Sequence, residues 1–362
     1  MRREFRQDRS GRTGGAPALS ALTIMLISAS LFAPLTSSLI LSKGTGSATF
    51  TRASSATCWG YAPTANSGDA QVLLVCASGE ARFTGARRIS QGVWSDYYAD
   101  GTLIPGSLRL GYLAESAATN LFLNSAVGVT QTTGTLTAAS YTLSFYGTGS
   151  IVGTGGFVGT LAGTGAANRV SLTVTASALA AVLTVTGSCT EVQLELGSIT
   201  TSYAPTTSIA VTRDADVLTY TLAGNADNTQ GAFYCEVIRP TSETVFSSTC
   251  PFMQLSNSSG QIGRFNATSE TTTVSTFDGT TQAIKSGLSS VTSGQRKRAS
   301  SWGALGQKAT GDGATPATVA FDGAMGPGTG NIIVGTNLNG NIRNIRLWIT
   351  QLTDAQLVTI TS

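Results

Sequence analysis

The chain has 362 residues, which is enough for two or three domains with cores of their own. Charged residues make up only 11% of it, less than half of the usual share of about 25%. Thr, Ser, Ala and 42 Gly stand in their place, and this composition favours sheets and turns over helices. The sequence has no histidine, so the commonest general base and the commonest metal ligand are both excluded.

The net charge of +3 is concentrated at the N-terminus. Residues 1–12 hold five arginines against Glu4 and Asp8, which gives this segment a charge of +3. The remaining chain carries 17 basic and 17 acidic side chains and is therefore neutral. A neutral body is not suited to binding nucleic acid electrostatically, so we expect no nucleic-acid partner.

Residues 18–41 form an apolar stretch behind this basic segment. A basic start followed by an apolar core has the outline of a secretory signal. A membrane anchor would need about 20 uninterrupted apolar residues, whereas Ser, Thr and Pro34 dilute this stretch. We favour a third interpretation, in which residues 1–43 are an assembly arm that becomes ordered when it docks on a partner protein.

From residue 44 onward, apolar and polar residues alternate with a period of two, which is the pattern of β-strands with one buried face. The clearest examples are Val170, Leu172 and Val174; Leu183 and Val185; Val192, Leu194 and Leu196; and Ile345, Leu347 and Ile349. Clusters of Gly, Ser, Asn and Thr between them predict the short turns of sandwiches. One short helix is expected near the end, because Thr353 and Gln356 have the spacing of a capping box.

The predicted fold class is all-β, with tandem antiparallel β-sandwich domains behind an extended N-terminal arm. The composition changes near residues 124–128, where the chain becomes rich in Thr and Gly, and again near 205–209, after a dense run of predicted strands. These changes divide the chain into an arm (1–43), an N-terminal β module (44–125), a compact sandwich (126–205) and a larger sandwich (206–362).

Several short segments, taken in order along the chain, are familiar from one group of proteins. They read ATFTRASSAT at 48–57, LAESAATNL at 113–121, VQLELG at 192–197, TSYAPT at 201–206, TRDAD at 212–216 and LNGNIRNI at 338–345. In this order they resemble the junctions of structural proteins from the tail fibres and head fibres of tailed bacteriophages. The resemblance covers most of residues 48–362 and does not extend to the arm.

The resemblance implies a jelly roll like carbohydrate-binding modules at 126–205 and a concanavalin A/laminin-G-like sandwich at 206–362. It also implies a virion protein, assembled in the host cytoplasm, that forms homo-oligomers, with a trimer favoured. Residues 1–43 would then bind other virion proteins of the capsid, portal or tail, and the sandwiches could bind host cell-surface polysaccharide. A tail-fibre or appendage protein is the leading interpretation. A capsid head-fibre or decoration protein and a glycan depolymerase are the alternatives.

The strongest catalytic candidate is the pair Glu191 and Glu195, with Gln193 between them. Alternate residues of a strand share a face, and the arrangement resembles the three-carboxylate site of some glycoside hydrolases. Retaining glycosidases need two carboxyl groups about 5 Å apart, and Gln193 replaces the group that would tune the other two. We therefore interpret the segment as a domain joint, and we predict a non-enzyme with no catalytic residue, cofactor or metal.

Three further features have structural explanations. The glycine-rich tract 147–165 lacks the spacing of a phosphate loop and predicts sandwich turns. Asp278, Asp312 and Asp322 each lie next to Gly, as in hairpin turns, although a loop carboxylate could also bind calcium. The five cysteines predict buried thiols rather than a disulfide framework, with Cys58 and Cys76 as the pair that could be bridged.

Five aromatic residues could stack on a sugar or mark a protein interface. Trp94, Tyr97 and Tyr98 form one group, and Trp302 and Trp348 lie in the predicted last domain. Trp348 interrupts the apolar alternation of its strand, so it is expected to point away from that core. A tryptophan on the outside serves a protein interface as readily as a glycan site, and we favour the interface.

Overall fold

The computed structural model describes residues 48–221, 225, 227–239, 250–255, 261–265, 273–291, 294–325, 331–335 and 338–362. The expected arm (1–43), with its apolar stretch, lies outside the described residues. Strands account for 50% of the described residues and helix for 3%, so the all-β prediction is confirmed.

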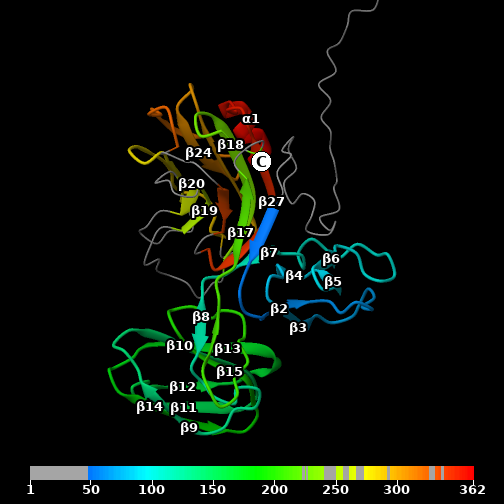
Figure 1. The fold of residues 1–362 in the computed structure, drawn as a ribbon, viewed down its shortest axis with the longest axis vertical. Helices are drawn as coiled ribbons and strands as arrows, with labels where there is room; N and C mark the ends of the chain where they lie inside the picture. Colours follow the sequence, from blue (N-terminus) through cyan, green and yellow to red (C-terminus); the bar gives the residue numbers. More distant parts are fainter. Residues whose placement is uncertain are drawn as a thin grey trace, which may run out of the picture.

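Two seven-stranded antiparallel sheets form the larger sandwich (Figure 1). In spatial order, the first consists of β1 (Ala48–Thr51), β17 (Val217–Thr221), β26 (Asn331–Val334), β19 (Cys250–Leu255), β20 (Gln261–Phe265), β21 (Val274–Phe277) and β22 (Gln282–Lys285). The second consists of β25 (Ala317–Val319), β24 (Gln307–Gly311), β23 (Arg296–Trp302), β18 (Gly231–Ile238), β27 (Gly340–Trp348), β7 (Gly111–Ala114) and β4 (Phe83–Thr84).

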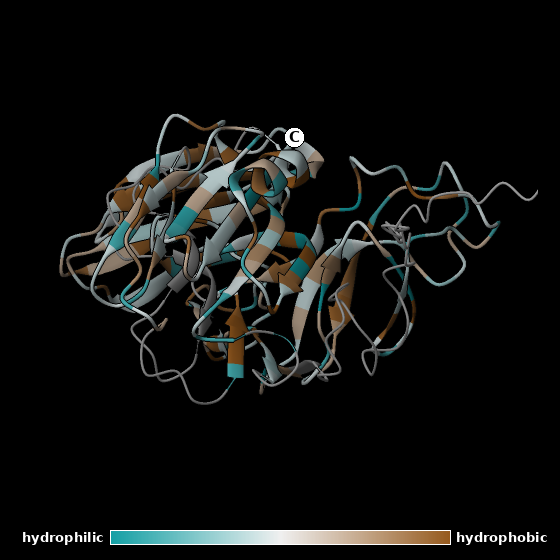
Figure 2. Ribbon diagram, turned by 90° about the horizontal axis from the view of Figure 1, so that it is seen from above, coloured by the Kyte–Doolittle hydropathy of each residue, from teal (hydrophilic) through white to brown (hydrophobic). Residues whose placement is uncertain are grey.

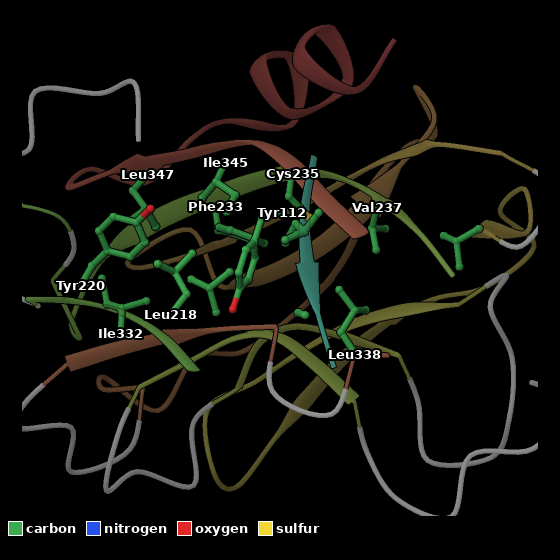
Figure 3. Packing of buried hydrophobic residues seen from close by; sticks show 14 of the residues in the cluster. Tyr112, Leu218, Tyr220, Phe233, Cys235, Val237, Ile332, Leu338, Ile345 and Leu347 are labelled. Atoms are coloured by element: carbon green, nitrogen blue, oxygen red, sulfur yellow. The ribbon is translucent and has the colours of Figure 1, made fainter. Parts of the chain in front are cut away.

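The core of the larger sandwich lies between these two sheets. Leu218, Tyr220 and Ile332 come from the first sheet, whereas Phe233 and Leu347 come from the second, and each is at most 2% exposed. Figure 3 shows the two sets facing each other. Alternate residues of a strand share a face, so each strand places one apolar row in the core. The resulting alternation of hydrophobic and hydrophilic residues along the strands is visible in Figure 2.

The small sandwich is built from residues 131–196 and has a separate core. Its three-stranded sheet consists of β13 (Gly165–Thr175), β10 (Ser140–Gly147) and β15 (Cys189–Leu196). Its four-stranded sheet consists of β12 (Gly159–Ala162), β11 (Ser150–Gly155), β14 (Ala180–Thr186) and β9 (Gln131–Thr135). The glycine-rich tract, for which sandwich turns were predicted, forms the strands β11 and β12 as well as the turns between strands. Gly147 is required at its bend, because its φ is +134° and a Cβ there would lie 2.1 Å from the Ser188 carbonyl oxygen.

The small sandwich is an insertion in the larger one. β1 pairs with β17, with Thr51 opposite Val217, and β7 pairs with β27. The predicted module 44–125 thus supplies strands to both large sheets, together with the predicted sandwich 206–362. Alternation indicates which face of a strand is buried, but not which strand lies beside it, so this long-range pairing was not predicted from the sequence.

The chain enters and leaves the small sandwich through two neighbouring segments. β8 (Ala118–Asn120) pairs with β16 (Val211–Arg213). Beyond this pair the Asn124 amide donates a 2.7 Å hydrogen bond to the Thr207 carbonyl. The composition changes predicted near 124–128 and 205–209 fall at this crossing point.

Two small hairpins lie beside the large sandwich (Figure 1). They are formed by β2 (Ala56–Gly60) with β3 (Val72–Cys76) and by β5 (Arg87–Ser90) with β6 (Val93–Ser95). Next to them, Tyr61, Ala65, Tyr98 and Ile104 form a small buried cluster of their own. The two hairpins therefore form an extension at the side of the large sandwich rather than a further sandwich.

The predicted C-terminal helix is present as α1 (Asp354–Thr361), and its capping box is confirmed. The Gln356 amide donates to the Thr353 hydroxyl, and the Thr353 amide donates to the Gln356 side-chain oxygen at 2.9 Å. Leu357 is buried against Tyr234 on the outer side of the second large sheet. Among the described residues, no helix is long and apolar enough to cross a membrane.

Candidate functional site

Five charged residues meet in the interior where the large sandwich adjoins the small one, and we call them the ionic joint. Arg52 follows β1, Arg82 precedes β4, Glu115 follows β7, Arg213 ends β16 and Asp216 precedes β17. All five are at most 8% exposed. Antiparallel pairing explains the gathering, because the end of β1 lies beside the start of β17 and brings Arg52 next to Asp216.

The carboxylates of the ionic joint lie among the guanidinium groups. Arg52 Nη1 lies 2.8 Å from Asp216 Oδ1, and Arg82 Nη2 lies 2.8 Å from Glu115 Oε2 and also bonds Asp216. Arg213 is farther away, at 3.6 Å from Glu115 and 3.8 Å from Asp216. The Glu115 amide donates to Asp216 Oδ2 at 3.1 Å. Three cations thus share two anions, which offsets much of the cost of burying them.

The ionic joint also binds the segment that leaves the small sandwich between β15 and β16, residues 197–210, which we call the exit segment. Arg82 Nη1 donates to the Ser202 hydroxyl at 2.7 Å and to the Thr57 carbonyl at 2.8 Å. The Ser202 amide donates to Glu115 Oε1 at 2.9 Å. The Thr57 hydroxyl donates to the Tyr203 carbonyl at 2.9 Å. The large sandwich, the β2–β3 hairpin and the exit segment therefore share one buried network.

The charged side chains around each member of the ionic joint determine whether it is ionised. Burial by itself would raise the pKa of Glu115, but Arg213 and Arg82 lower that pKa to about 2. Burial would lower the pKa of Arg82, but Glu115 and Asp216 raise it above its ordinary value. A carboxylate held ionised in this way cannot exchange protons near neutral pH. The joint is therefore suited to fixing strands in place and unsuited to acid–base catalysis.

A second buried cluster lies on the outgoing strand β15, and we call it the Glu195 cluster. Glu195 accepts hydrogen bonds from Gln193 Nε2 at 2.8 Å, from the Thr201 amide at 2.9 Å and from the Thr201 hydroxyl at 2.6 Å. Gln193 Oε1 accepts from the Ala204 amide at 2.8 Å. These side chains hold the exit segment against β15, which agrees with the interpretation of this segment as a joint.

Glu191 departs from the expected same-face arrangement with Gln193 and Glu195. Its φ is +51°, and the register between β10 and β15 shifts at this point. A bulge therefore interrupts the alternation, and Cys189 and Val192 both enter the core although they are three residues apart. Burial raises the pKa of both Glu191 and Glu195. Glu195 itself is fully buried, so a substrate has no path to it.

The structure does not support the expected role of most aromatic candidates. Trp94 and Trp302 are at most 2% exposed and belong to the core of the large sandwich, and Tyr98 is 5% exposed against Tyr61. Trp348 does point away from that core, as predicted, but it packs in the cluster beneath α1. Only Tyr97, at 41% exposed, presents its ring to solvent among these candidates. The sequence could not predict this burial, because it depends on which distant strands cover each ring.

The aspartate and cysteine candidates also have defined surroundings. Asp278 and Asp322 both accept hydrogen bonds from the Thr280 hydroxyl, at 3.0 and 2.8 Å, whereas Asp312 pairs with an arginine elsewhere. Within the described ranges, no three His, Cys, Asp or Glu side chains form a group that could hold a metal ion. Cys58 and Cys76 are buried free thiols with their sulfurs 3.8 Å apart, whereas a disulfide bond is about 2.05 Å long.

Comparison of the chain with models of protein families, with curated proteins and with solved structures finds no match. Function must therefore be inferred from the arrangement of the residues themselves. Four members of the ionic joint lie in or beside the segments quoted for the resemblance to phage proteins, and this was the only sequence signal for the joint. Arg82 carries no comparable signal, and sequence reasoning missed it.

Proposed function

We propose that this protein is a non-enzymatic structural component of a tailed-bacteriophage particle, of the tail-fibre or appendage type, anchored through residues 1–43. The observation that supports the proposal best is the ionic joint. The segments quoted for the resemblance to phage proteins are far apart in the sequence, yet Arg52, Glu115, Ser202 and Asp216 from these segments meet in one buried network. Their shared role in the architecture explains why they occur together and in this order.

The ionic joint lies between the two sandwiches, and this is where a protein that projects from a particle needs a rigid connection. An appendage transmits force between its anchored end and its free end, and a flexible connection would let the two sandwiches rotate against each other. Charge-assisted hydrogen bonds in the interior restrict such rotation more than contacts between exposed residues do. A glycan depolymerase, the enzymatic alternative, is not favoured, because Glu195 is buried and fully hydrogen-bonded.

Incorporation into particles tests the proposal directly. The full-length chain and a variant lacking residues 1–43 would be expressed, each with an affinity tag, in cells that produce the phage. We expect the full-length chain in purified particles and the truncated chain in the soluble fraction, with the same β-sheet circular dichroism. Absence of the full-length chain from particles would overturn the virion assignment, whereas incorporation of the truncated chain would overturn only the anchor.

The non-enzymatic part of the proposal has a separate test. Host cell-surface polysaccharide would be incubated with the full-length chain and with Glu191→Gln and Glu195→Gln variants, and released reducing ends would be measured. We expect no release by any of the three. Release by the wild type that is lost in the Glu191→Gln variant would establish a glycoside hydrolase instead.

A further inference from the structure

The small sandwich differs from the rest of the molecule in its charge. Residues 126–205 contain only three charged side chains, Arg169, Glu191 and Glu195. All three belong to the three-stranded sheet, on β13 and β15. Arg169 donates to the Thr201 carbonyl at 2.6 Å, and the Glu195 carboxylate accepts from the Thr201 amide. These two charged side chains therefore hold the exit segment in place. The four-stranded sheet β12–β11–β14–β9 carries no charged residue at all.

The outer face of this four-stranded sheet can be read row by row from the strand register. Its three rows are Ala162–Ser150–Thr186, Thr160–Val152–Thr184 and Thr154–Val182–Thr132. The inner positions between them, such as Ile151 and Leu183, are fully buried. Val152 and Val182 are 40% and 39% exposed at the centre of the outer face. We call these nine residues the neutral face.

The neutral face is unusual for a surface exposed to water. The solvent side of an antiparallel sheet normally carries long charged side chains, which keep copies of the protein apart. Here every position is Ala, Ser, Thr or Val. Further exposed apolar side chains border the sheet at its turns, with Val158 at 70% and Leu179 at 58% exposed. Depletion of charge around exposed apolar residues is the composition found at the centre of protein interfaces.

We infer that copies of this chain associate through the neutral face, with the faces packed on one another around a symmetry axis. The inference goes beyond the proposed function, which names no contact between copies, and it does not require the protein to be part of a virion. A second copy is the partner that fits best, because it presents an equally uncharged surface. Where the same face of two copies meets at a symmetry axis, a charged face would lie against its own charge, and the neutral face avoids this repulsion.

The arrangement of the layers leaves the face free for such a contact. Figure 1 places β9, β11 and β14 at the end of the small sandwich that is remote from the large sandwich. With about 4.8 Å between strands and about 3.3 Å per residue, the face covers on the order of 400 Å² per copy. Stable interfaces bury about 800 Å² per partner. The neutral face alone should therefore support weak association that depends on concentration.

Sedimentation velocity of the full-length chain over a concentration series tests the inference. The double substitution Val152→Lys, Val182→Lys places two charges at the centre of the face. The control Ser171→Lys, Thr175→Lys adds the same charge at exposed positions of β13, in the other sheet. We expect the wild type and the control to associate as concentration rises, and the double variant to remain monomeric or to bind at least tenfold more weakly. A wild type that is monomeric throughout, or a double variant that associates like the control, would overturn the inference.

Cross-linking gives a second readout that does not depend on the lysine variants folding. A Thr184→Cys variant carries a thiol in the central row of the neutral face, and a Ser171→Cys variant carries one on the other sheet. A short bismaleimide should join two Thr184→Cys chains and leave the Ser171→Cys chains single. The reverse pattern would contradict the proposed face even if the chain proved oligomeric. Neither readout involves particles, so failure here is distinguishable from failure of the virion proposal.

Discussion

Two buried polar clusters fix the segment that leaves the small sandwich, and they stabilise a buried carboxylate in different ways. In the ionic joint, Glu115 lies beside arginines, and its pKa falls to about 2. In the Glu195 cluster, the carboxylate accepts hydrogen bonds from Gln193 and from Thr201, and burial raises its pKa although the charge of Arg169 and these hydrogen bonds lower it. Neutral donors and the charge of Arg169 compensate only part of the lost hydration, whereas the arginines of the ionic joint compensate more than all of it.

The difference indicates separate contributions to stability. Removing one member of the ionic joint takes the nearest partner away from buried charged groups, so its members depend strongly on one another. The groups that donate directly to Glu195 are neutral, so the Glu195 cluster tolerates a neutral side chain of the same shape. The two clusters should also respond to pH in opposite directions. Three measurements distinguish the two clusters, and the expected effect decreases from the first measurement to the third.

The largest effect is expected from Arg82→Met. The substitution keeps an apolar stem of similar length but removes the closest cation that Glu115 and Asp216 share, because Arg213 lies farther away, at 3.6 and 3.8 Å. Breaking a buried pair from one side costs about 3–5 kcal/mol, measured as the free energy of unfolding in urea. The control is Arg346→Met, because Arg346 is exposed on β27 and its guanidinium lies 5.5 Å from the centre of the Tyr234 ring. The control should lose at most about 1 kcal/mol. Equal losses in the two variants would contradict the special role of the ionic joint.

The second effect is acid destabilisation through Glu115. Its folded pKa of about 2 lies below the ordinary value of 4.5, so its contribution is complete above pH 4.5 and is lost as the pH falls toward 2. The loss should be on the order of 3 kcal/mol. Urea unfolding at intervals between pH 5 and 2, for the wild type and for Glu115→Gln, isolates this contribution. The variant should be less stable at pH 5 and should lose less stability on acidification. If the free energy of unfolding fell equally with pH in the wild type and the variant, carboxylates other than Glu115 would account for the acid destabilisation.

Local sequence signals predicted local structure well. The capping box at Thr353 and Gln356 predicted the only helix among the described residues, and the alternation at Ile345 and Leu347 predicted a strand of the core. Both signals depend on residues within a few positions of one another, so no knowledge of the tertiary fold is needed. The all-β class follows for the same reason.

Long-range structure was predicted less well. Arg82 bonds Asp216, which lies 134 positions later in the sequence. No pattern in the residues next to either of them predicts this ion pair. Trp302 was expected at the surface or an interface, yet it is fully buried, because β18 and the opposite sheet cover it. The insertion of the small sandwich has the same cause. Strand partners are selected by the packing of the whole fold, and a single sequence does not reveal them.

The smallest effect, and the sharpest test of the contrast, is expected from Glu195→Gln. A raised folded pKa means that Glu195 contributes most below its unfolded pKa and that this contribution is lost as the pH rises through the folded pKa. Glutamine has no charge to bury, so the free energy of unfolding of the variant should match that of the wild type at pH 4 and should exceed it increasingly as the pH rises to 8.

Glu80→Gln provides the opposite case in the same measurement. The pKa of Glu80 is lowered, because the hydrogen bond from Arg88 and two backbone amides outweigh its burial. The wild type gains the contribution of Glu80 as the pH rises toward 4.5, so that variant should become less stable than the wild type between pH 3 and 5 and should stay less stable up to pH 8. If Glu195→Gln fell behind in the same way, the hydrogen bonds from Gln193 and Thr201 would be holding the carboxylate ionised. The two clusters would then differ only in strength, and the Glu195 cluster would count as a weaker form of the ionic joint.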